Sequence, residues 1–284
     1  MPAQTWVIGC GDIGRRVAAS YGGQIVRGVV RSKSSVDSCQ NTNIIASQID
    51  LDTSYTLPHE QFNNANVFYF APPPSTGLND SRLEVFLNTV SNLPKRIVLI
   101  STTGVYGDSK GEWIDENTPI NPKTERAHRR VSAEQLLQGW ASNHNREFMI
   151  LRVPGIYAQD RLPLSRLKKG LAVVNENEAG WTNRIHADDL AQACKAAMEC
   201  ERKNQIINVT DGNPSSMTDY FNRVADYAGL ARPPQISIKE AEETLSEGMV
   251  SYLKESRRIR NEKMLGMLDI TLKYPSLEKA LFKN

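Results

Sequence analysis

Short apolar runs alternate with helix-like stretches along the first 150 residues of the chain. The runs lie at 6–8, 24–31, 43–50, 65–71, 96–101 and 148–153. One amphipathic stretch extends from about Asp80 to Asn92, and a longer one extends from Pro119 to about Asn143. Apolar strands connected by helices are typical of a parallel sheet that is covered on both faces. The pattern therefore predicts an α/β fold with a doubly wound parallel sheet of the Rossmann type.

The regular alternation weakens after residue 160. Residues 161–182 read as loops, 184–201 leads into a helix, and a short strand and a further helix follow at 205–210 and 218–229. We predict a dinucleotide-binding core at 1–160 and a smaller mixed α/β substrate lobe at 161–284. Within that lobe, 184–201 is expected to pack back on the core.

Composition narrows the class of protein. Of the 284 residues, 40% are hydrophobic and 23% are charged, and the net charge is +2, which argues against nucleic-acid or membrane partners. No apolar run approaches the ~18 residues of a membrane span, and no leader pattern precedes the first strand. Cys10, Cys39, Cys194 and Cys200 have neither metal-ligand spacing nor a histidine cluster beside them. We expect a cytoplasmic protein without a metal site.

A glycine turn follows the first strand. It reads Gly9-Cys-Gly-Asp-Ile-Gly14, with the spacing GxGxxG between a strand and a helix. In such a turn the first glycine permits the bend, the second lets a pyrophosphate approach, and the third lets helix and strand pack closely. The helix start offers unpaired N–H groups to phosphate. The predicted cofactor residues here are Gly9, Gly11, Asp12, Ile13 and Gly14.

Ligands of doubly wound sheets bind at the carboxyl ends of the strands. The residues at the other predicted strand ends are Arg31, Ser32, Asp50, Leu51, Ala71, Pro72, Pro73, Ser101, Val153 and Pro154. Arg31 follows the second strand, where an NAD site commonly has an acidic residue, and arginine pairs well with phosphate. NADP(H) is therefore favoured over NAD(H). The alternative for Arg31 is a surface arginine that only stacks on adenine. The alternative for Asp50 is a residue that only caps the end of its strand.

Four segments together carry a family resemblance: Gly9–Gly14, Ile100–Gly107, Leu151–Tyr157 and Arg184–Ala191. With Ser256–Lys263 near the C-terminus, their order and spacing resemble the extended short-chain dehydrogenase/reductases, the group of nucleotide-sugar epimerases and dehydratases. The resemblance implies a Rossmann fold, an NAD(P) site and a substrate cleft between two lobes. It also implies that residues 50–51 border the adenine and that residues 71–73 lie along the ribose and pyrophosphate.

The catalytic pattern of that family is not matched in the expected helix. The resemblance implies a Ser/Thr, here Thr102, and a Tyr-x-x-x-Lys pair in which the Tyr exchanges a proton with substrate. Alignment on Ala133-Glu134 places Arg126 at the Tyr position and Arg130 at the Lys position. Arginine cannot act as a base at ordinary pH. Arg130 could still hold ribose hydroxyls, while Arg126 could bind an anionic substrate group or be a plain helix charge.

Other residues could supply the missing chemistry. Tyr106 is a candidate substitute acid/base, and Tyr157 is another hydroxyl expected near the cleft. Arg184 is a candidate substrate ligand. His186 with the Asp188-Asp189 pair suggests an acid/base set, but we favour helix capping by the Asp pair, with His186 packed behind.

Three functions compete at this point. The first is an atypical NADP-dependent oxidoreductase or epimerase acting on a small, polar and anionic substrate. The second is a non-catalytic NADP(H) sensor or scaffold, because Arg126 and Arg130 replace the catalytic pair. The third is a reductase whose acid is water or Thr102. A homodimer is also a candidate state, since helices 80–93 and 122–143 correspond to the family's usual dimer surface.

Overall fold

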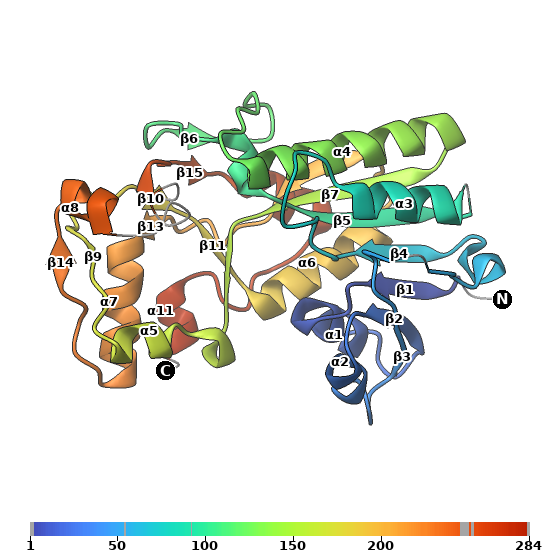
Figure 1. Cartoon of the computed structure of the whole chain (residues 1–284), viewed down its shortest axis with the longest axis horizontal. Coiled ribbons are helices and arrows are strands. Elements are labelled where there is room, and N and C mark those ends of the chain that lie inside the picture. Colours follow the sequence, from blue (N-terminus) through green and yellow to red (C-terminus); the bar gives the residue numbers. More distant parts are fainter. Residues whose placement is uncertain (1–2, 54, 92, 245–249, 251–252, 283–284) are drawn as a thin grey trace.

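The centre of the molecule is a seven-stranded sheet (Figure 1). The computed structural model describes residues 3–53, 55–91, 93–244, 250 and 253–282. The strands lie in the order β12-β7-β5-β4-β1-β2-β3, and each neighbouring pair is parallel. Their bounds are β1 Thr5–Ile8, β2 Val26–Val30, β3 Ile44–Gln48, β4 Asn66–Tyr69, β5 Arg96–Thr102, β7 Glu147–Val153 and β12 Gln205–Asn208. The predicted doubly wound Rossmann fold is confirmed.

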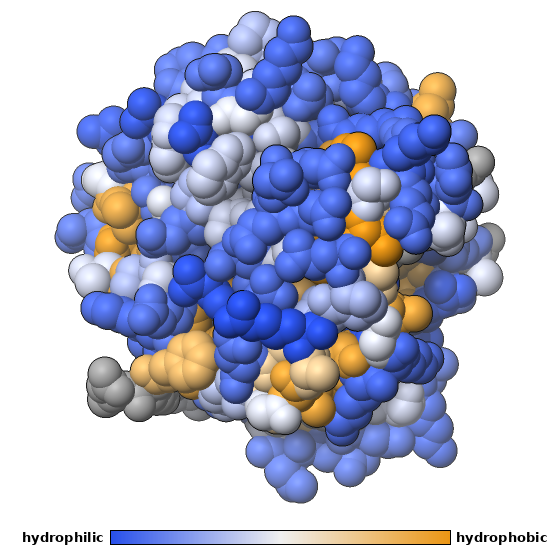
Figure 2. All heavy atoms as spheres, turned by 90° about the vertical axis from the view of Figure 1, so that its left-hand side faces the viewer, coloured by the Kyte–Doolittle hydropathy of each residue, from blue (hydrophilic) through white to orange (hydrophobic). Residues whose placement is uncertain are grey.

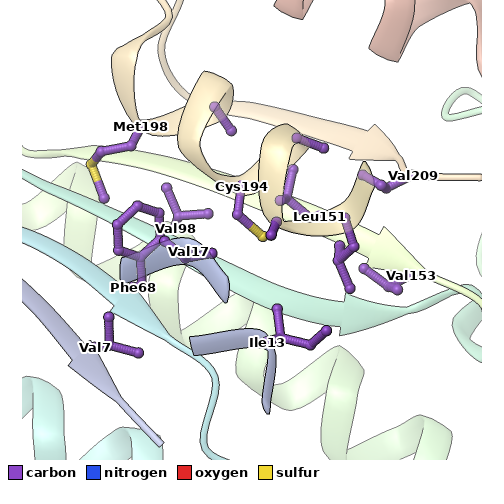
Figure 3. Packing of buried hydrophobic residues seen from close by; sticks show 14 of the residues in the cluster. Val7, Ile13, Val17, Phe68, Val98, Leu151, Val153, Cys194, Met198 and Val209 are labelled. Atoms are coloured by element: carbon purple, nitrogen blue, oxygen red, sulfur yellow. The ribbon is translucent and has the colours of Figure 1, made fainter. Parts of the chain in front are cut away.

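Helices cover both faces of this sheet (Figure 1). One face is covered by α1 (Asp12–Ala19), α2 (Lys33–Asp37) and α6 (Ala187–Glu199), and the other by α3 (Ser81–Val90) and α4 (Glu125–His144). Figure 3 shows the first of these layers, where Val17 of α1 and Cys194 of α6 lie over Leu151 of the sheet. Burial on both faces explains why the strands are apolar along their whole length.

The glycine turn has the geometry that its sequence predicts. Gly9 has φ +82°, and a Cβ there would lie 2.4 Å from the backbone nitrogen of Ala71. A Cβ on Gly14 would lie 2.8 Å from Cγ1 of Val7, so this glycine allows α1 to approach β1. Gly11 has no atom within 4 Å of such a Cβ. The first and third glycines are thus required by packing, whereas the second leaves open space.

A buried ion pair joins α4 to the sheet. Arg152 of β7 donates through Nη2 to Glu134 Oε2 at 2.7 Å and through Nε to Oε1 at 3.1 Å. Both residues are at most 4% exposed. Ser101 at the end of β5 donates from Oγ to the same Oε1 at 2.6 Å. Three elements therefore meet at one carboxylate.

The start of the long helix differs from the prediction. The helix begins at Glu125, not Pro119, and the Oγ1 of Thr124 caps it by accepting from the Ala127 N–H at 3.2 Å. The preceding segment is tied elsewhere, since the Asn121 N–H donates to the carbonyl oxygen of Val105 at 2.8 Å. A backbone donor used outside the helix cannot join its hydrogen-bond ladder.

The C-terminal lobe has its own small core beside the sheet (Figure 1). That core includes Phe221, Val224, Leu277 and Leu281. Short elements surround it: β8 Gly155–Tyr157, α5 Leu164–Lys168, β9 Val173–Val174, β10 Trp181–Thr182, β11 Arg184–His186, β13 Ser215–Ser216, α7 Met217–Ala228, β14 Gln235–Ile236, α8 Ile238–Thr244 and α11 Leu277–Leu281. Figure 2 shows that the outer face of this lobe is mainly hydrophilic, with small apolar patches.

The chain returns to the sheet within this C-terminal half. Helix α6 packs in the same apolar layer as α1, and β12 is the outermost strand beside β7. Helix α10 (Glu262–Leu268) adds Met264 and Leu268 to that layer. A further strand pair that the sequence did not suggest, β6 (Trp113–Ile114) with β15 (Arg258–Ile259), links the β5–α4 connection to the C-terminal region.

Two surveys of the described residues bear on partners. No helix in this part of the chain is both long enough and apolar enough to cross a membrane. Among the same residues, no group of three or more His, Cys, Asp or Glu is arranged to bind a metal ion.

The glycine turn generates a matched pair of stability predictions. Gly9→Ala should lower the free energy of unfolding by roughly 2–5 kcal/mol, because it adds a backbone clash to an unfavourable φ. Gly11→Ala should change it by less than about 0.5 kcal/mol, since its Cβ meets nothing. Chemical denaturation of both variants measures the difference. Equal losses in the two variants would contradict this account of the turn.

Candidate functional site

A cavity of about 220 Å³ lies between the carboxyl ends of the central strands and the C-terminal lobe. Its lining includes Thr102 after β5, Pro154 after β7 and Arg126 of α4. The opposite wall is formed by Arg184 of β11, Tyr220 of α7 and Arg257 near the C-terminus. The cavity therefore lies where ligands of doubly wound sheets bind.

The first turn of α1 fits a pyrophosphate. Gly11 is the N-cap of the helix, and it has no side chain to pair with the N–H groups of that turn. The space that a Cβ would fill at Gly11 is open, so a phosphate can approach the backbone closely. Ile13 points away from this space into the core, where it is 9% exposed. Glycine turn and helix start together have a geometry that fits the phosphates of a dinucleotide.

Asp12 of this turn belongs to an ionic network. Its Oδ2 accepts from Arg161 Nη1 at 2.7 Å and its Oδ1 accepts from Arg16 Nε at 3.0 Å. Arg16 also pairs with Asp160 at 3.0 Å and with Asp188 at 2.5 Å. Although partial burial acts in the opposite direction, the hydrogen bonds from Arg161 and Arg16 hold the pKa of Asp12 below its usual value. Asp12 thus stays ionised, and Arg16 and Arg161 balance its negative charge beside the glycine turn.

The ends of β2 and β3 bring Arg31 and Asp50 together. Arg31 Nε lies 3.3 Å from Asp50 Oδ2, and the arginine side chain is 70% exposed. Beside it, Ser32 caps α2 by accepting from the Ser35 N–H, and its Oγ lies 3.0 Å from that of Ser34. The exposed Arg31 therefore lies next in the chain to the hydroxyl groups of Ser32 and Ser34, after the end of β2.

Residues 71–73 leave the end of β4 close to this edge. Arg82 of α3 donates through Nη1 to the carbonyl oxygens of Pro72 at 2.8 Å and Pro73 at 3.3 Å. The same guanidinium pairs with Asp52 at 2.5 Å, which joins the segment to the loop that contains Leu51. This pairing lowers the pKa of Asp52.

Tyr106 and Ser101, both predicted site residues, are held by partners outside the cavity lining. The Tyr106 ring is buried below Arg152, and its hydroxyl donates to Asn208 Oδ1 at 2.9 Å. The Ser101 hydroxyl is bonded to Glu134. Neither residue is part of the cavity lining, so the structure does not support Tyr106 as a substitute acid/base or a cofactor contact from the Ser101 side chain. Both side chains are held by tertiary partners that local sequence does not reveal.

Thr102 does line the cavity. Its Oγ1 accepts from the Gly104 N–H at 3.2 Å, which orients the side chain at the end of β5. Val153, one residue before Pro154, is 3% exposed and packs in the core.

The two arginines of α4 have different surroundings. Arg126 is exposed and lines the cavity. Arg130 donates through Nη1 to the carbonyl oxygen of Ile100 at 3.0 Å, and burial lowers its pKa although Asp80 nearby opposes that effect. The letters Tyr-x-x-x-Lys do occur at residues 106–110, but they lie on a turn whose lysine is exposed. Within α4, arginines thus occupy both positions that the resemblance assigns to the catalytic pair.

Arg184 is a buried cation in the cavity wall. It donates to Ser215 Oγ and Thr182 Oγ1, both at 2.8 Å, and it lies 4.5 Å from the ring centre of Tyr220. Burial lowers its pKa, while Asp211 opposes the shift. Only 6% of the residue is exposed, so the cavity wall carries a desolvated positive charge.

Sequence reasoning missed other cavity residues. Arg257 pairs through Nη1 with Glu255 at 2.7 Å, and Trp181 lines the cavity with 43% of its surface exposed. Arg258 lies over the Trp181 ring at 5.3 Å and over the Trp113 ring at 5.4 Å. Only the C-terminal family resemblance at 256–263 pointed to this region.

The prediction that the Asp188-Asp189 pair caps α6 was wrong, because another residue is the cap. His186 is the N-cap, since its Nδ1 accepts from the Asp188 N–H at 3.1 Å. Asp189 instead accepts from the N–H groups of Lys273 and Tyr274, at 2.8 and 2.9 Å. Burial lowers the pKa of His186, which favours the neutral ring that a cap acceptor requires. These contacts explain the positions of His186, Asp188 and Asp189 without an acid/base role.

Asp211 lies buried next to Arg184. It is 5% exposed, and its Oδ1 accepts from the Asn213 N–H at 3.0 Å. Burial raises the pKa of its carboxyl to about 7, with Arg184 opposing the shift. Near neutral pH this acid only partly balances the charge of Arg184.

Comparison with known proteins supports the family resemblance. The model of the NAD dependent epimerase/dehydratase family matches residues 83–210. Protein YeeZ of Escherichia coli K12 is 30% identical over 141 residues, which is 49% of this chain and 48% of that protein. The chain thus spans about half the length of the curated relatives it matches.

Solved structures match almost the whole chain. A functionally unknown conserved protein from Silicibacter pomeroyi has a TM-score of 0.84 and 26% identity, covering 98% of this chain and 96% of that one. The UDP-glucuronic acid 4-epimerase of Bacillus cereus in complex with NAD has a TM-score of 0.78 at 16% identity, with the same coverage, and shows the shared fold. Fold and glycine turn define a protein of the Rossmann class. The matches confirm its resemblance to the NAD dependent epimerase/dehydratase family.

The buried Asp211 predicts a pH-dependent stability difference. The unfolded carboxyl loses its proton near pH 4, whereas the folded one keeps it to about pH 7. The folded state then binds more protons between these values, so the contribution of Asp211 to stability falls as pH rises through this window. Asp211→Asn lacks this loss and should gain stability relative to wild type from pH 4 to 7, with no further gain above about pH 8. Parallel stability curves, measured by chemical denaturation, would refute the assignment.

Proposed function

We propose that this protein binds NADP(H) and acts as an atypical oxidoreductase or epimerase-like enzyme on a small anionic substrate. The observation that carries the proposal is the position of the cavity, which adjoins the carboxyl ends of β5 and β7, at the edge of the parallel sheet where β1 leads into the glycine turn, and carries the buried Arg184. The family resemblance supports a nucleotide sugar as the substrate class. The cytoplasmic setting, the homodimer and the division between core and substrate lobe stay part of this proposal.

The choice of NADP(H) rests on Arg31. Its guanidinium is exposed and pairs with Asp50 at 3.3 Å and with Asp52 at 3.8 Å, at the end of the strand next to the glycine turn. A 2′-phosphate could replace Asp50 as its partner and accept from the hydroxyls of Ser32 and Ser34 as well. Arginine suits phosphate because its planar group presents several donors. The Bacillus cereus epimerase structure contains NAD, so this preference would distinguish the present chain from that protein.

Each part of the site has a role in this proposal. NADP(H), when bound, supplies hydride transfer. The N–H groups of α1 and the glycine turn hold the pyrophosphate, and Arg130 stands where a ribose-holding lysine is implied. Thr102 receives the Gly104 N–H at its oxygen, so its own proton can be donated into the cavity. Arg126 and Arg184 bind the anionic part of the substrate, and water or Thr102 supplies the proton.

One observation favours a second function, a non-catalytic NADP(H) sensor or scaffold. Arg126 lines the cavity at the position where the resemblance implies the catalytic tyrosine. A guanidinium stays protonated and cannot take a proton from substrate. The sensor keeps the dinucleotide cradle and uses the cavity only for binding.

The cofactor proposal predicts that NADPH binds more tightly than NADH. Arg31→Ala should weaken NADPH binding about tenfold or more, because a charge-assisted contact to phosphate is lost, and should leave NADH binding unchanged. Nicotinamide fluorescence titrations measure both constants. Arg232→Ala, which removes an exposed lobe arginine, is the control. Tighter binding of NADH by the wild type would exclude the phosphate role.

The missing base can be restored. Arg126→Tyr combined with Arg130→Lys should raise the rate of UDP-glucose conversion by about 10²-fold or more, the usual range for a positioned acid/base group. NMR of the sugar products measures the rate, with Arg126→Phe combined with Arg130→Lys as the matched control. No gain in the double variant would show that the α4 substitutions do not limit catalysis. Turnover by the wild type would exclude the sensor.

A further inference from the structure

Tyr157 is a residue of the cavity lining with an unusual, buried hydroxyl. The residue ends β8 and is 2% exposed, with its ring in an edge contact to His186 at 5.3 Å. Tyr157 lines the cavity, yet its buried hydroxyl has no hydrogen-bond partner among the described residues. A phenylalanine would fill the same space without leaving a polar atom unpaired. The hydroxyl therefore costs stability in the ligand-free fold, and a partner from outside the chain would remove that cost.

The register of the β8–β11 pair brings Arg184 and Tyr157 to the same side of the two strands. In the parallel pair of β8 and β11, Arg184 is opposite Gly155 and His186 is opposite Tyr157. Positions two apart on a strand face the same side, so Arg184 and Tyr157 project from neighbouring strands toward one side. Gly155 between them has no side chain. A Cβ there would lie 3.9 Å from Arg184 Cγ, which is an ordinary contact, so Gly155 lies beside the arginine stem.

The charge of Arg184 has no ion-pair partner among the described residues and is only partly balanced by the nearby Asp211. Its hydrogen bonds end on neutral oxygens, those of Ser215, Thr182 and the Ser216 carbonyl. Within the described ranges no carboxylate lies at ion-pair distance from Arg184. The nearby Asp211 holds its proton to about pH 7. A buried guanidinium surrounded by neutral groups favours an anion that enters from the cavity.

Tyr157 suits that anion as a donor. Burial raises its pKa well above the ordinary value, and the carboxyls of Asp211 and Asp189 add to this shift while Arg184 opposes it. The hydroxyl thus stays protonated at working pH. It can donate a hydrogen bond to an anion, but it cannot serve as a base.

We propose that Tyr157 and Arg184 together bind the anionic group of the substrate, a carboxylate or a phosphate, at the inner wall of the cavity. The inference rests on the proposed function, because that function makes this cavity the substrate site. It adds Tyr157, a residue of the family segment Leu151–Tyr157 to which the resemblance gives no binding role. It also places the substrate's charge at the β8–β11 strand pair, with Arg126 across the cavity.

The test separates binding from folding with three variants. Tyr157→Phe should leave the melting temperature unchanged or higher, since no internal hydrogen bond is lost. Tyr106→Phe, the matched control, should lower it, because its hydroxyl is bonded to Asn208. Inorganic phosphate and malonate are titrated by calorimetry into the full chain with and without NADPH. Tyr157→Phe and Arg184→Gln should each weaken the binding of the preferred anion, the former about tenfold, while Tyr106→Phe should not.

Each outcome bears on a definite claim. Tighter binding of phosphate than of malonate assigns the site to phosphate, and the reverse order assigns it to carboxylate. Unchanged anion affinity in Tyr157→Phe, or no binding of either anion to a wild type that binds NADPH, overturns the inference and leaves the cofactor proposal intact. Anion binding without NADPH binding overturns the cofactor proposal instead. If Arg184→Gln does not fold, Tyr157→Phe alone decides.

Discussion

The buried pair of Glu134 and Arg152 is the interaction on which the geometry of the site depends. A single charge without a partner at this depth would cost several kcal/mol, so the two residues are stable only together. Glu134 also accepts from Ser101, and Arg152 lies over the ring of Tyr106. The pair thus holds α4 against β5 and β7. Because α4 carries the arginines at positions 126 and 130, their placement at the carboxyl edge follows from this contact.

Charges around the two halves of the site are arranged differently. Beside the glycine turn, Arg16 is matched by three carboxylates, and α1 is fastened to α6 and to residues 160–161. In the cavity, the buried Arg184 meets only hydroxyls, a carbonyl oxygen and an aromatic ring. The first arrangement is complete within the chain and serves structure. The second leaves Arg184 without an ion pair among the described residues, and this is why an anion is proposed as its partner.

The family resemblance and the chemistry of the site support different conclusions. The overall fold is shared with an epimerase of low sequence identity, and such likeness establishes a fold but not a reaction. What distinguishes this chain is a set of side chains at the cleft, with arginine on α4 and a buried arginine with an unpaired tyrosine on β8 and β11. Any reaction in this cleft has to be compatible with arginine at both α4 positions to which the resemblance assigns the catalytic pair.

The sequence by itself determined the sheet and the glycine turn. These follow from local rules, because strand burial appears as apolar runs and a bend of positive φ requires Gly9. Tertiary structure alone decided which polar groups remain available for chemistry. All three of Tyr106, Ser101 and Tyr157 carry a hydroxyl, and the first two donate it to Asn208 and Glu134. The buried hydroxyl of Tyr157, a residue of the cavity lining, has no hydrogen-bond partner among the described residues. Hydrogen-bond partners come from residues far away in sequence, so only the assembled fold determines which hydroxyl is left for a ligand.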